Sequence, residues 1–149
     1  DISERLPLAL RVSRYYMEVA NVAVDMAKVQ EDLPYIEDKT LAEELGQFRR
    51  ECVALLELAD PLNEKFSSEA ALQGLETLEQ HYQQLKAKLL HAGAQERIRL
   101  QQMVTELDLY SNVRRAMEQA VKGASHLRML MELAKNYPLP EAASTGPSN

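Results

Sequence analysis

The chain has 149 residues, of which 46% are hydrophobic and 27% charged, and it carries a formal net charge of −6 with a pI near 5.1. This length suits a single domain with a substantial core, and the acidic balance argues against a nucleic-acid partner, because phosphate binding requires a cationic face. The single cysteine rules out a disulfide within the chain, and no run approaches the roughly 20 apolar residues that cross a bilayer.

The first predicted helix runs to Pro34, because a proline disfavours helical backbone in the residue before it. Its apolar residues recur at steps of three and four, which places them on one face. They are Val12, Tyr15, Val19, Val22, Met26, Val29 and Leu33. The acids of this segment are predicted to form its outward face, namely Glu18, Asp25, Glu31 and Asp32. The helical pattern begins directly after Asp1, which is compatible with excision from a longer protein.

The second helix is predicted to begin at a capping box formed by Thr40 and Glu43, and to end near Pro61. Its apolar stripe is Leu41, Leu45, Phe48, Cys52, Leu55, Ala59 and Leu62. The third helix is predicted to be capped by Ser67 or Ser68 and to end at Gly93 in the left-handed conformation. Its apolar stripe is Ala71, Leu75, Leu78, Tyr82, Leu85 and Leu89.

The fourth helix is predicted from about Ala94 to Lys135, since no proline interrupts this segment. A straight helix of that length would measure roughly 60 Å, so it must overhang its neighbours or bend, with residues 111–112 and Gly123 as the expected bends. Its apolar residues are Ile98, Leu100, Met103, Leu107, Tyr110, Met117, Val121, Ala124, Leu127 and Met131. Residues 138–149 are rich in Pro, Ser, Ala and Gly and are predicted to form a disordered tail.

No segment alternates with period two for long enough to form a strand, so the chain is predicted to be all-α. Four helices joined by short loops predict one antiparallel up-down helical bundle domain over residues 1–137. The first and fourth helices are the longest, and each carries apolar residues beyond a single stripe. We therefore expect them to form a protruding end and any partner surface, which is compatible with a homodimer.

The histidines do not form a metal motif. A di-iron bundle needs Glu-x-x-His on two helices, whereas Leu, Lys and Gly stand three residues before His81, His91 and His126. These residues and Cys52 also lack the paired spacing of a zinc site. His81 is instead expected to be a partly exposed surface residue, and no metal-ligating residue is predicted.

The residues also give no indication of an enzyme. Cys52 has the apolar neighbours Phe48 and Leu55, where low polarity keeps a thiol protonated and inert. The five glycines are isolated and form no phosphate-binding loop. Acids lie near the basic pairs at 49–50 and 114–115, which indicates solvated helix faces. The sequence therefore predicts no catalytic residue, no cofactor-binding residue and no cofactor.

Two groups of polar residues leave other functions open. Four tyrosines could line a small-ligand pocket of a sensor domain, although tyrosine on a helical stripe more often belongs to the core or its rim. They are Tyr15, Tyr16, Tyr82 and Tyr110. Six acids near the first loop and on the fourth helix could bind Mg²⁺ or Ca²⁺, although solvated acids are the commoner explanation. They are Glu31, Asp32, Glu37, Asp38, Glu106 and Asp108.

Three segments carry a family resemblance, namely "SRYYMEVANVAVDMAKVQ", "FRRECVALLELAD" and "RRAMEQAVKGASHL". At these segments, and over most of residues 8–134, the chain resembles the PhoU-like cytosolic domain at the C-terminus of bacterial sodium/phosphate cotransporter family proteins. The resemblance implies an antiparallel helical bundle that takes part in phosphate uptake or its control. It also implies a partner in the membrane, at the cytoplasmic face of the inner membrane; otherwise we expect a cytoplasmic protein.

The chain departs from that family at its metal-binding motif. Many PhoU-like domains bind a multinuclear metal cluster through Glu-x-x-x-Asp on a helix. Here Met17 and Asn21 stand where the two acids would, and Glu-x-x-x-Asp occurs nowhere in the chain. A thioether and a neutral amide are poor ligands for hard metal ions. The resemblance thus implies a member that lacks the cluster.

These observations favour a non-catalytic regulatory or interaction domain. Its expected partner is its own transmembrane transporter domain, or another membrane or regulatory protein. A small-ligand sensor and a metal-binding phosphate-signalling regulator are the alternatives.

Overall fold

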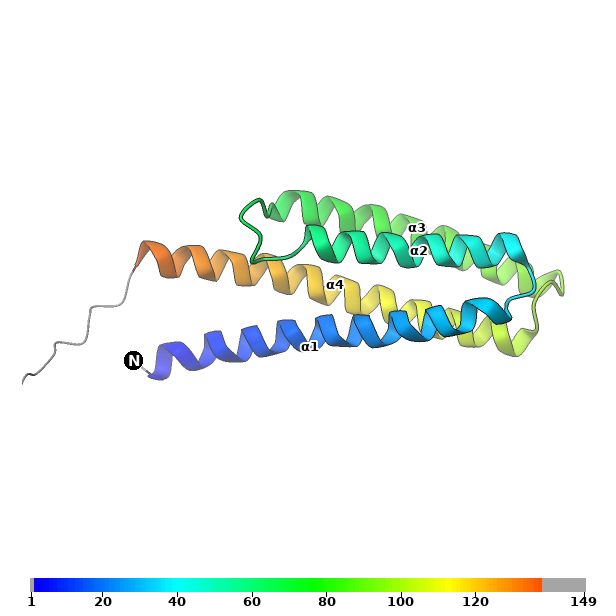
Figure 1. The fold of residues 1–149 in the computed structure, drawn as a ribbon, viewed down its shortest axis with the longest axis horizontal. Helices are drawn as coiled ribbons and strands as arrows, with labels where there is room; N and C mark the ends of the chain where they lie inside the picture. The colour runs from blue at the N-terminus through cyan, green and yellow to red at the C-terminus, as the bar shows by residue number, and fades with distance from the viewer. Residues whose placement is uncertain (1, 138–149) are drawn as a thin grey trace, which may run out of the picture.

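In the computed structural model, which describes residues 2–137, four α-helices and one short 3₁₀ helix follow one another. They are α1 (Ile2–Asp32), η1 (Leu33–Tyr35), α2 (Lys39–Leu58), α3 (Ser68–Ala94) and α4 (Leu100–Asn136). Figure 1 shows that successive α-helices run in opposite directions, and the described residues contain no strand. The predicted all-α antiparallel bundle is confirmed. The tail predicted at residues 138–149 lies outside the described residues.

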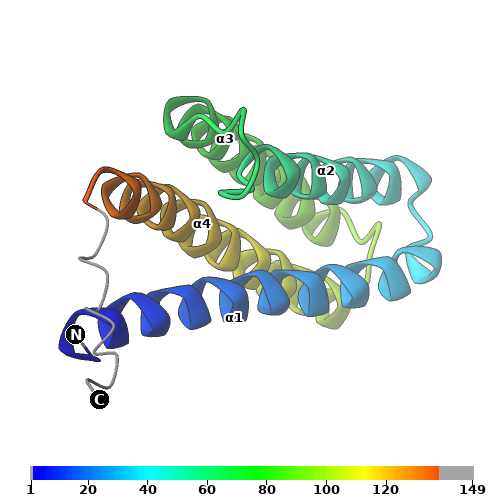
Figure 2. The same ribbon diagram turned by 60° about the vertical axis from the view of Figure 1, so that its left-hand side comes forward.

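The last helix, α4, is central to the packing. Figure 2 shows it between α1 on one side and the α2–α3 hairpin on the other. The most extensive contacts in the bundle join α1 to α4 and α3 to α4, whereas α2 packs mainly on α3. Consequently, α1 and the α2–α3 hairpin are held together chiefly through α4.

Most residues of the predicted apolar stripes form the core or pack against it. Leu62 and Leu100 are 61% and 69% exposed, because α2 ends before the first and α4 begins at the second. At the centre of the bundle the Phe48 ring lies 5.7 Å from the Tyr110 ring and 6.3 Å from the Tyr82 ring, between centroids. Three helices therefore meet at one aromatic cluster.

The start of α2 differs from the predicted capping box. The N-cap is Asp38, whose backbone is extended and whose carboxylate accepts the Leu41 N–H at 3.0 Å. Thr40 lies within the first turn of the helix. Asp38 also pairs with Arg97 of the α3–α4 loop at 2.5 Å, and both contacts lower the pKa of its carboxyl group. The carboxylate that caps α2 thus also ties two loops together.

At α3 the structure resolves the choice between two serines. Ser67 is the N-cap, and its hydroxyl accepts the Ala70 N–H at 3.2 Å. Ser68 is the first residue of the helix. An N-cap serine typically contributes about 1 kcal/mol, because it satisfies a backbone donor that has no partner within the helix.

We expect Ser67→Ala to lower the free energy of unfolding by about 1 kcal/mol, and Ser68→Ala to change it by only a few tenths. Urea denaturation followed by circular dichroism measures both. Equal losses in the two variants would mean that the Ser67 hydroxyl does not stabilise the helix.

The end of α3 was predicted at the wrong residue. The helix continues to Ala94, and the residue with positive φ is Glu96, at 57°. The Glu96 N–H bonds to the Gly93 carbonyl and the Arg97 N–H to the Ala92 carbonyl, which is the Schellman arrangement. Residues 95–99 therefore reverse the chain, and α4 starts at Leu100 rather than near Ala94.

Gly93 has a different role, since it allows a close approach between α3 and α4. A Cβ atom at this position would overlap the Met103 sulfur. The glycine thus reflects packing rather than backbone conformation. Bends were expected in α4 at residues 111–112 and at Gly123. The helix is continuous from Leu100 to Asn136, so neither position interrupts it.

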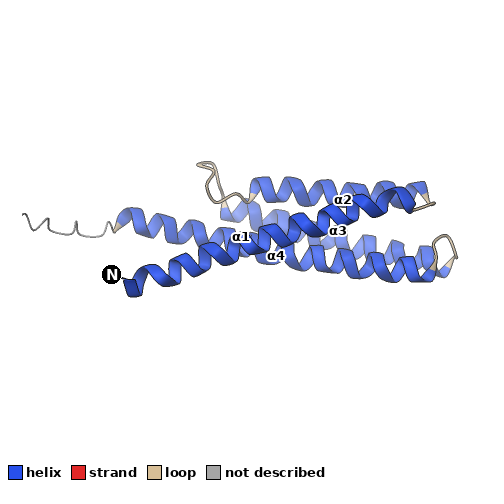
Figure 3. Cartoon of the chain, turned by 60° about the horizontal axis from the view of Figure 1, so that its bottom comes forward, coloured by secondary structure: helices blue, strands red, loops and turns tan. Residues whose placement is uncertain are grey.

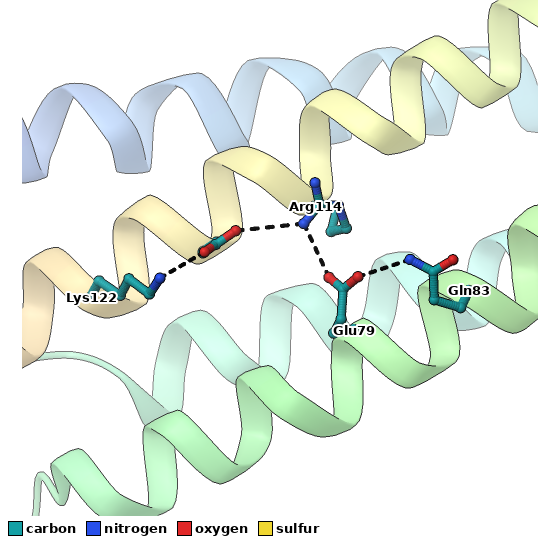
Figure 4. A network of polar contacts seen from close by, with 5 residues as sticks. Glu79, Gln83, Arg114 and Lys122 are labelled. Carbon is teal, nitrogen blue, oxygen red and sulfur yellow. Dashed lines mark hydrogen bonds and ion pairs between the residues drawn. The ribbon is translucent and has the colours of Figure 1, made fainter.

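One ion pair connects α3 to α4, and two further pairs within α4 extend it. The Arg114 guanidinium lies 3.1 Å from an oxygen of Glu79 on α3 and 3.5 Å from an oxygen of Glu118. The Glu118 carboxylate also accepts from Lys122. Figure 4 labels Glu79, Arg114 and Lys122 in this network. The Arg114 guanidinium lies 5.3 Å from the centroid of the Tyr82 ring. In the other predicted basic pair, Arg50 bonds to Glu43 at 2.7 Å. Arg50 and Arg114 are therefore paired with acids, whereas Arg49 is half-buried and its Nε has no hydrogen-bond partner among the described residues.

Beyond the α2–α3 loop, α1 and α4 continue as a pair of helices (Figures 1 and 3). Arg128 marks where the pair leaves the bundle, because its guanidinium donates to the carbonyl groups of Pro61 and Asn63 in that loop, each at 3.1 Å. We call residues 2–14 of α1 and 129–137 of α4 the arm. The overhang predicted for the two longest helices is confirmed.

Candidate functional site

The histidines and the cysteine do not converge. His81 is partly exposed, as predicted, and its Nδ1 lies 2.6 Å from a Glu51 oxygen. Cys52 is fully buried, and burial, followed by the nearby Glu51 carboxylate, raises the pKa of its thiol to about 12. Within residues 2–137, no group of three or more His, Cys, Asp or Glu side chains could hold a metal ion.

The four tyrosines proposed for a ligand pocket are also dispersed. Tyr82 and Tyr110 belong to the core, Tyr15 is half-buried against α4, and Tyr16 is 51% exposed. None of these side chains lines any of three clefts found on the described part of the chain, near Glu106, near His81 and between α1 and α4. Burial, with a smaller effect of Asp60, raises the pKa of Tyr15 to about 12. These rings therefore serve packing.

The acids of α1 lie closer to α4 than predicted. Glu18 and Asp25 are half-buried and line a groove of about 590 Å³ between α1 and α4, together with Lys28 and Arg115. The outward face predicted for them was therefore only partly right, since Glu31 is exposed whereas Asp32 is half-buried. The two cations balance the acids of this groove, and Lys28 lies 3.7 Å from Asp25.

One acid was placed wrongly by the sequence. Glu106 was predicted to be a solvated surface acid, but it is only 2% exposed and is the one charged side chain of the described residues that the bundle buries. It stands four residues before Tyr110 and seven before Val113, on the buried face of α4. This spacing could have predicted its burial from the sequence.

Glu106 faces a cleft of about 600 Å³ at the end of the bundle opposite the arm. The cleft is formed where α1 ends and α4 begins, by the last residue of α1, η1, the α3–α4 loop and the first two turns of α4. We call it the Glu106 cleft. Its charged side chains are Asp32, Glu37, Glu96, Arg97, Arg99 and Glu106.

The Glu106 carboxylate has no hydrogen-bond or ion-pair partner among the described residues. Burial, with a smaller contribution from Asp32, raises its pKa from the ordinary 4.5 to about 7. Near neutral pH this carboxyl group is therefore close to the midpoint of its titration. Such a group readily exchanges a proton or accepts a cation.

Further unpaired polar atoms lie deeper in the bundle. The Tyr110 hydroxyl, one turn after Glu106, is buried without a hydrogen-bond partner, and so is Nε of Arg49 on α2. Burial and the Glu106 carboxylate both raise the pKa of Tyr110. The tyrosine hydroxyl therefore stays protonated near neutral pH.

A second candidate surface lies on the outer face of α1. Its large apolar residues at steps of four and seven occupy one face, opposite the buried stripe of the same helix. We call this set the outer stripe; it consists of Leu6, Leu10, Met17 and Val24, which are 57%, 62%, 65% and 55% exposed. On the arm, Met129 and Leu133 of α4 are about equally exposed, at 50% and 49%.

A partner surface was predicted on the two longest helices, but the residues of the outer stripe were not predicted to form it. Met17, which the sequence resemblance aligns with an acid of the PhoU-like metal motif, belongs to this outer stripe. Small residues flank the stripe, including Ser13 and Ala20, so that another helix could approach closely. Large exposed apolar residues aligned on one helix face commonly mark interaction sites.

None of the helices within residues 2–137 combines the length and the apolar character that crossing a bilayer requires. Comparison with protein-family models, with curated proteins and with solved structures gave no match.

Proposed function

We propose that the chain is a non-catalytic regulatory domain that acts by protein contact through the outer stripe of α1 and the adjoining arm. The observation that carries this proposal is the exposure of four large apolar side chains along one face of a long helix. A solvent-facing stripe has no stabilising role in the isolated bundle, whereas it gains free energy when a partner covers it.

The partner that fits this surface best is another apolar or amphipathic helix. Steps of four and seven residues are the spacing with which one helix packs along another. In line with the sequence resemblance, we propose a PhoU-like domain of a sodium-dependent phosphate transporter, with the transporter's own transmembrane part, or another membrane or regulatory protein, as the partner. A second copy of the chain is the alternative.

Photo-crosslinking in the full-length parent protein tests the contact. We expect a crosslinker placed at Leu10 or Met17 to capture a membrane-embedded partner segment. The matched control is Leu72 of α3, which is 45% exposed and lies outside the stripe. Equal capture from position 72 would contradict the proposed surface, and capture of a second copy would assign a homodimer.

Substitution provides a second readout. Met17→Lys should abolish the crosslink from Leu10 while changing the free energy of unfolding by no more than about 0.5 kcal/mol, because the side chain is exposed. A large loss of stability would show that Met17 belongs to the core. The transporter assignment has its own test, which is whether the reading frame upstream of Asp1 encodes several apolar spans of about 20 residues.

A further inference from the structure

The Glu106 cleft lies at the opposite end of α4 from the arm and has no part in the function proposed above. Its distinctive feature is Glu106, a residue that is only 2% exposed, lines a cleft of about 600 Å³, and forms no hydrogen bond or ion pair with another described residue. Burying an ionised carboxylate without a hydrogen bond or a counter-charge is costly, so structures rarely leave one in this state. The arrangement calls for a group from outside the chain.

The charges around Glu106 indicate which group would fit. Asp32, at the end of α1, lies near Glu106 on the same wall and adds a second negative charge. Arg97 is already paired with Asp38, whereas Arg99 is exposed at the mouth of the cleft. The least exposed charges of the cleft are therefore the acids Glu106 and Asp32, whereas Arg99 is exposed, as are Glu37 and Glu96.

We propose that the Glu106 cleft binds a small organic ammonium compound, whose ammonium group lies between the carboxylates of Asp32 and Glu106. An ammonium group donates three hydrogen bonds, and its positive charge would neutralise the negative charge of the two carboxylates. The volume is within the range of small-molecule sites.

A metal ion fits less well. The described residues offer no third carboxylate or histidine near these two acids, and a divalent cation needs several oxygen ligands. The two arginines on the same lining would also repel a compact divalent charge. An organic ligand can instead separate its positive end from these arginines.

The ammonium chemistry has two sources, which are simple amines and amino acids. No side chain caps the N-terminus of α4, where Arg99 is the N-cap residue. The free N–H groups of the first turn of α4, together with the Arg99 guanidinium, can therefore hold a carboxylate. Along the helix, Glu106 lies about 9 Å from this end. We therefore expect an amino acid with a terminal ammonium group to bind more tightly than the matching diamine.

Isothermal titration calorimetry on the whole chain tests the proposal with two matched probes, 1,4-diaminobutane and ornithine, which differ by one carboxylate. We expect binding at millimolar concentration or below. Near pH 7 the ammonium group should displace on the order of half a proton from Glu106, because this group is then half ionised. Titrations in buffers of different ionisation enthalpy measure that release.

Glu106→Gln keeps the shape of the side chain but removes its charge. We expect it to weaken binding at least about tenfold and to abolish the proton release, while circular dichroism remains that of the wild type. The matched control is Glu57→Gln, the same change on an exposed acid at the C-terminal end of α2, which does not line the cleft. This variant should leave binding unchanged.

Arg99→Gln separates the two sources. If it weakens ornithine but not 1,4-diaminobutane, the ligand is an amino acid, and if the two probes bind equally in both proteins, the ligand is a simple amine. The proposal is wrong if neither probe binds at millimolar concentration. It is also wrong if Glu106→Gln binds like the wild type, or if Glu57→Gln is equally impaired.

Discussion

Replacing Phe48 by alanine is expected to lower the free energy of unfolding by about 3 to 5 kcal/mol. The ring is 3% exposed and lies in the aromatic cluster with Tyr82 and Tyr110, so that α2, α3 and α4 each lose packing when it is removed. The gap cannot collapse easily, because the neighbouring rings are themselves fixed by their helices. The total free energy of unfolding of a domain of this size is typically only about 5 to 15 kcal/mol.

Urea denaturation followed by circular dichroism measures this loss. The chain offers a matched control in its other phenylalanine, Phe66, which is only half-buried in the α2–α3 loop beside Arg128. Phe66→Ala should cost less than half as much, since less of the ring is removed from water. Similar losses in both variants would show that the aromatic cluster is not the centre of the core.

The stability of the wild-type protein is expected to fall as Glu106 ionises, and Glu106→Gln should remove this fall. The pKa of Glu106 is about 7 in the folded state and 4.5 when unperturbed, so the folded state binds the proton more tightly. The contribution of this group is therefore fully present below about pH 4.5 and is lost as the pH rises through about 7. Since one pKa unit corresponds to about 1.4 kcal/mol, the loss is on the order of 3 kcal/mol.

The measurement is the free energy of unfolding of both proteins at several values from pH 4.5 to 8. The other acids that line the cleft, Asp32, Glu37 and Glu96, are the same in both proteins, so the difference between the two curves isolates Glu106. We expect the variant to match the wild type near pH 4.5 and to exceed it at pH 8. Parallel curves would mean that the Glu106 carboxylate is solvated or paired in solution.

Much of the fold could be predicted because helical spacing is a local property of the sequence. The stripes of the second and third helices gave nearly all of their buried residues, and Pro34 fixed the end of the first helix. The helix ends were harder, because competing caps differ by small free energies. Asp38 caps α2 in place of Thr40, and its carboxylate is also held by Arg97, which is distant in sequence.

The α3–α4 turn could not be predicted from residue types alone. A glycine usually takes the left-handed position that ends a helix, yet Glu96 takes it here. Gly93 is required instead by Met103 of the next helix, and such a contact exists only once both helices are in place. The same limit applies to the cleft, whose two acids, Asp32 and Glu106, lie far apart in the sequence.

Glu106 is the residue that sequence reasoning misjudged most. Charged residues are mostly exposed in folded proteins, so Glu106 was predicted at the surface. Its position on the apolar face of α4 indicated burial instead. The outer stripe shows the opposite case, since its leucines and valine would normally be assigned to a core. In both places the departure from the usual pattern marks a candidate functional surface.

The pairing of α1 with α4 has a consequence for how the chain folds. The α2–α3 hairpin can form from neighbouring segments, whereas α1 must wait for the last helix before Val22, Met26 and Val29 leave water. During synthesis these side chains stay uncovered until the ribosome has released almost the whole described region. The high sequence separation of this contact slows folding relative to bundles whose neighbouring helices pair.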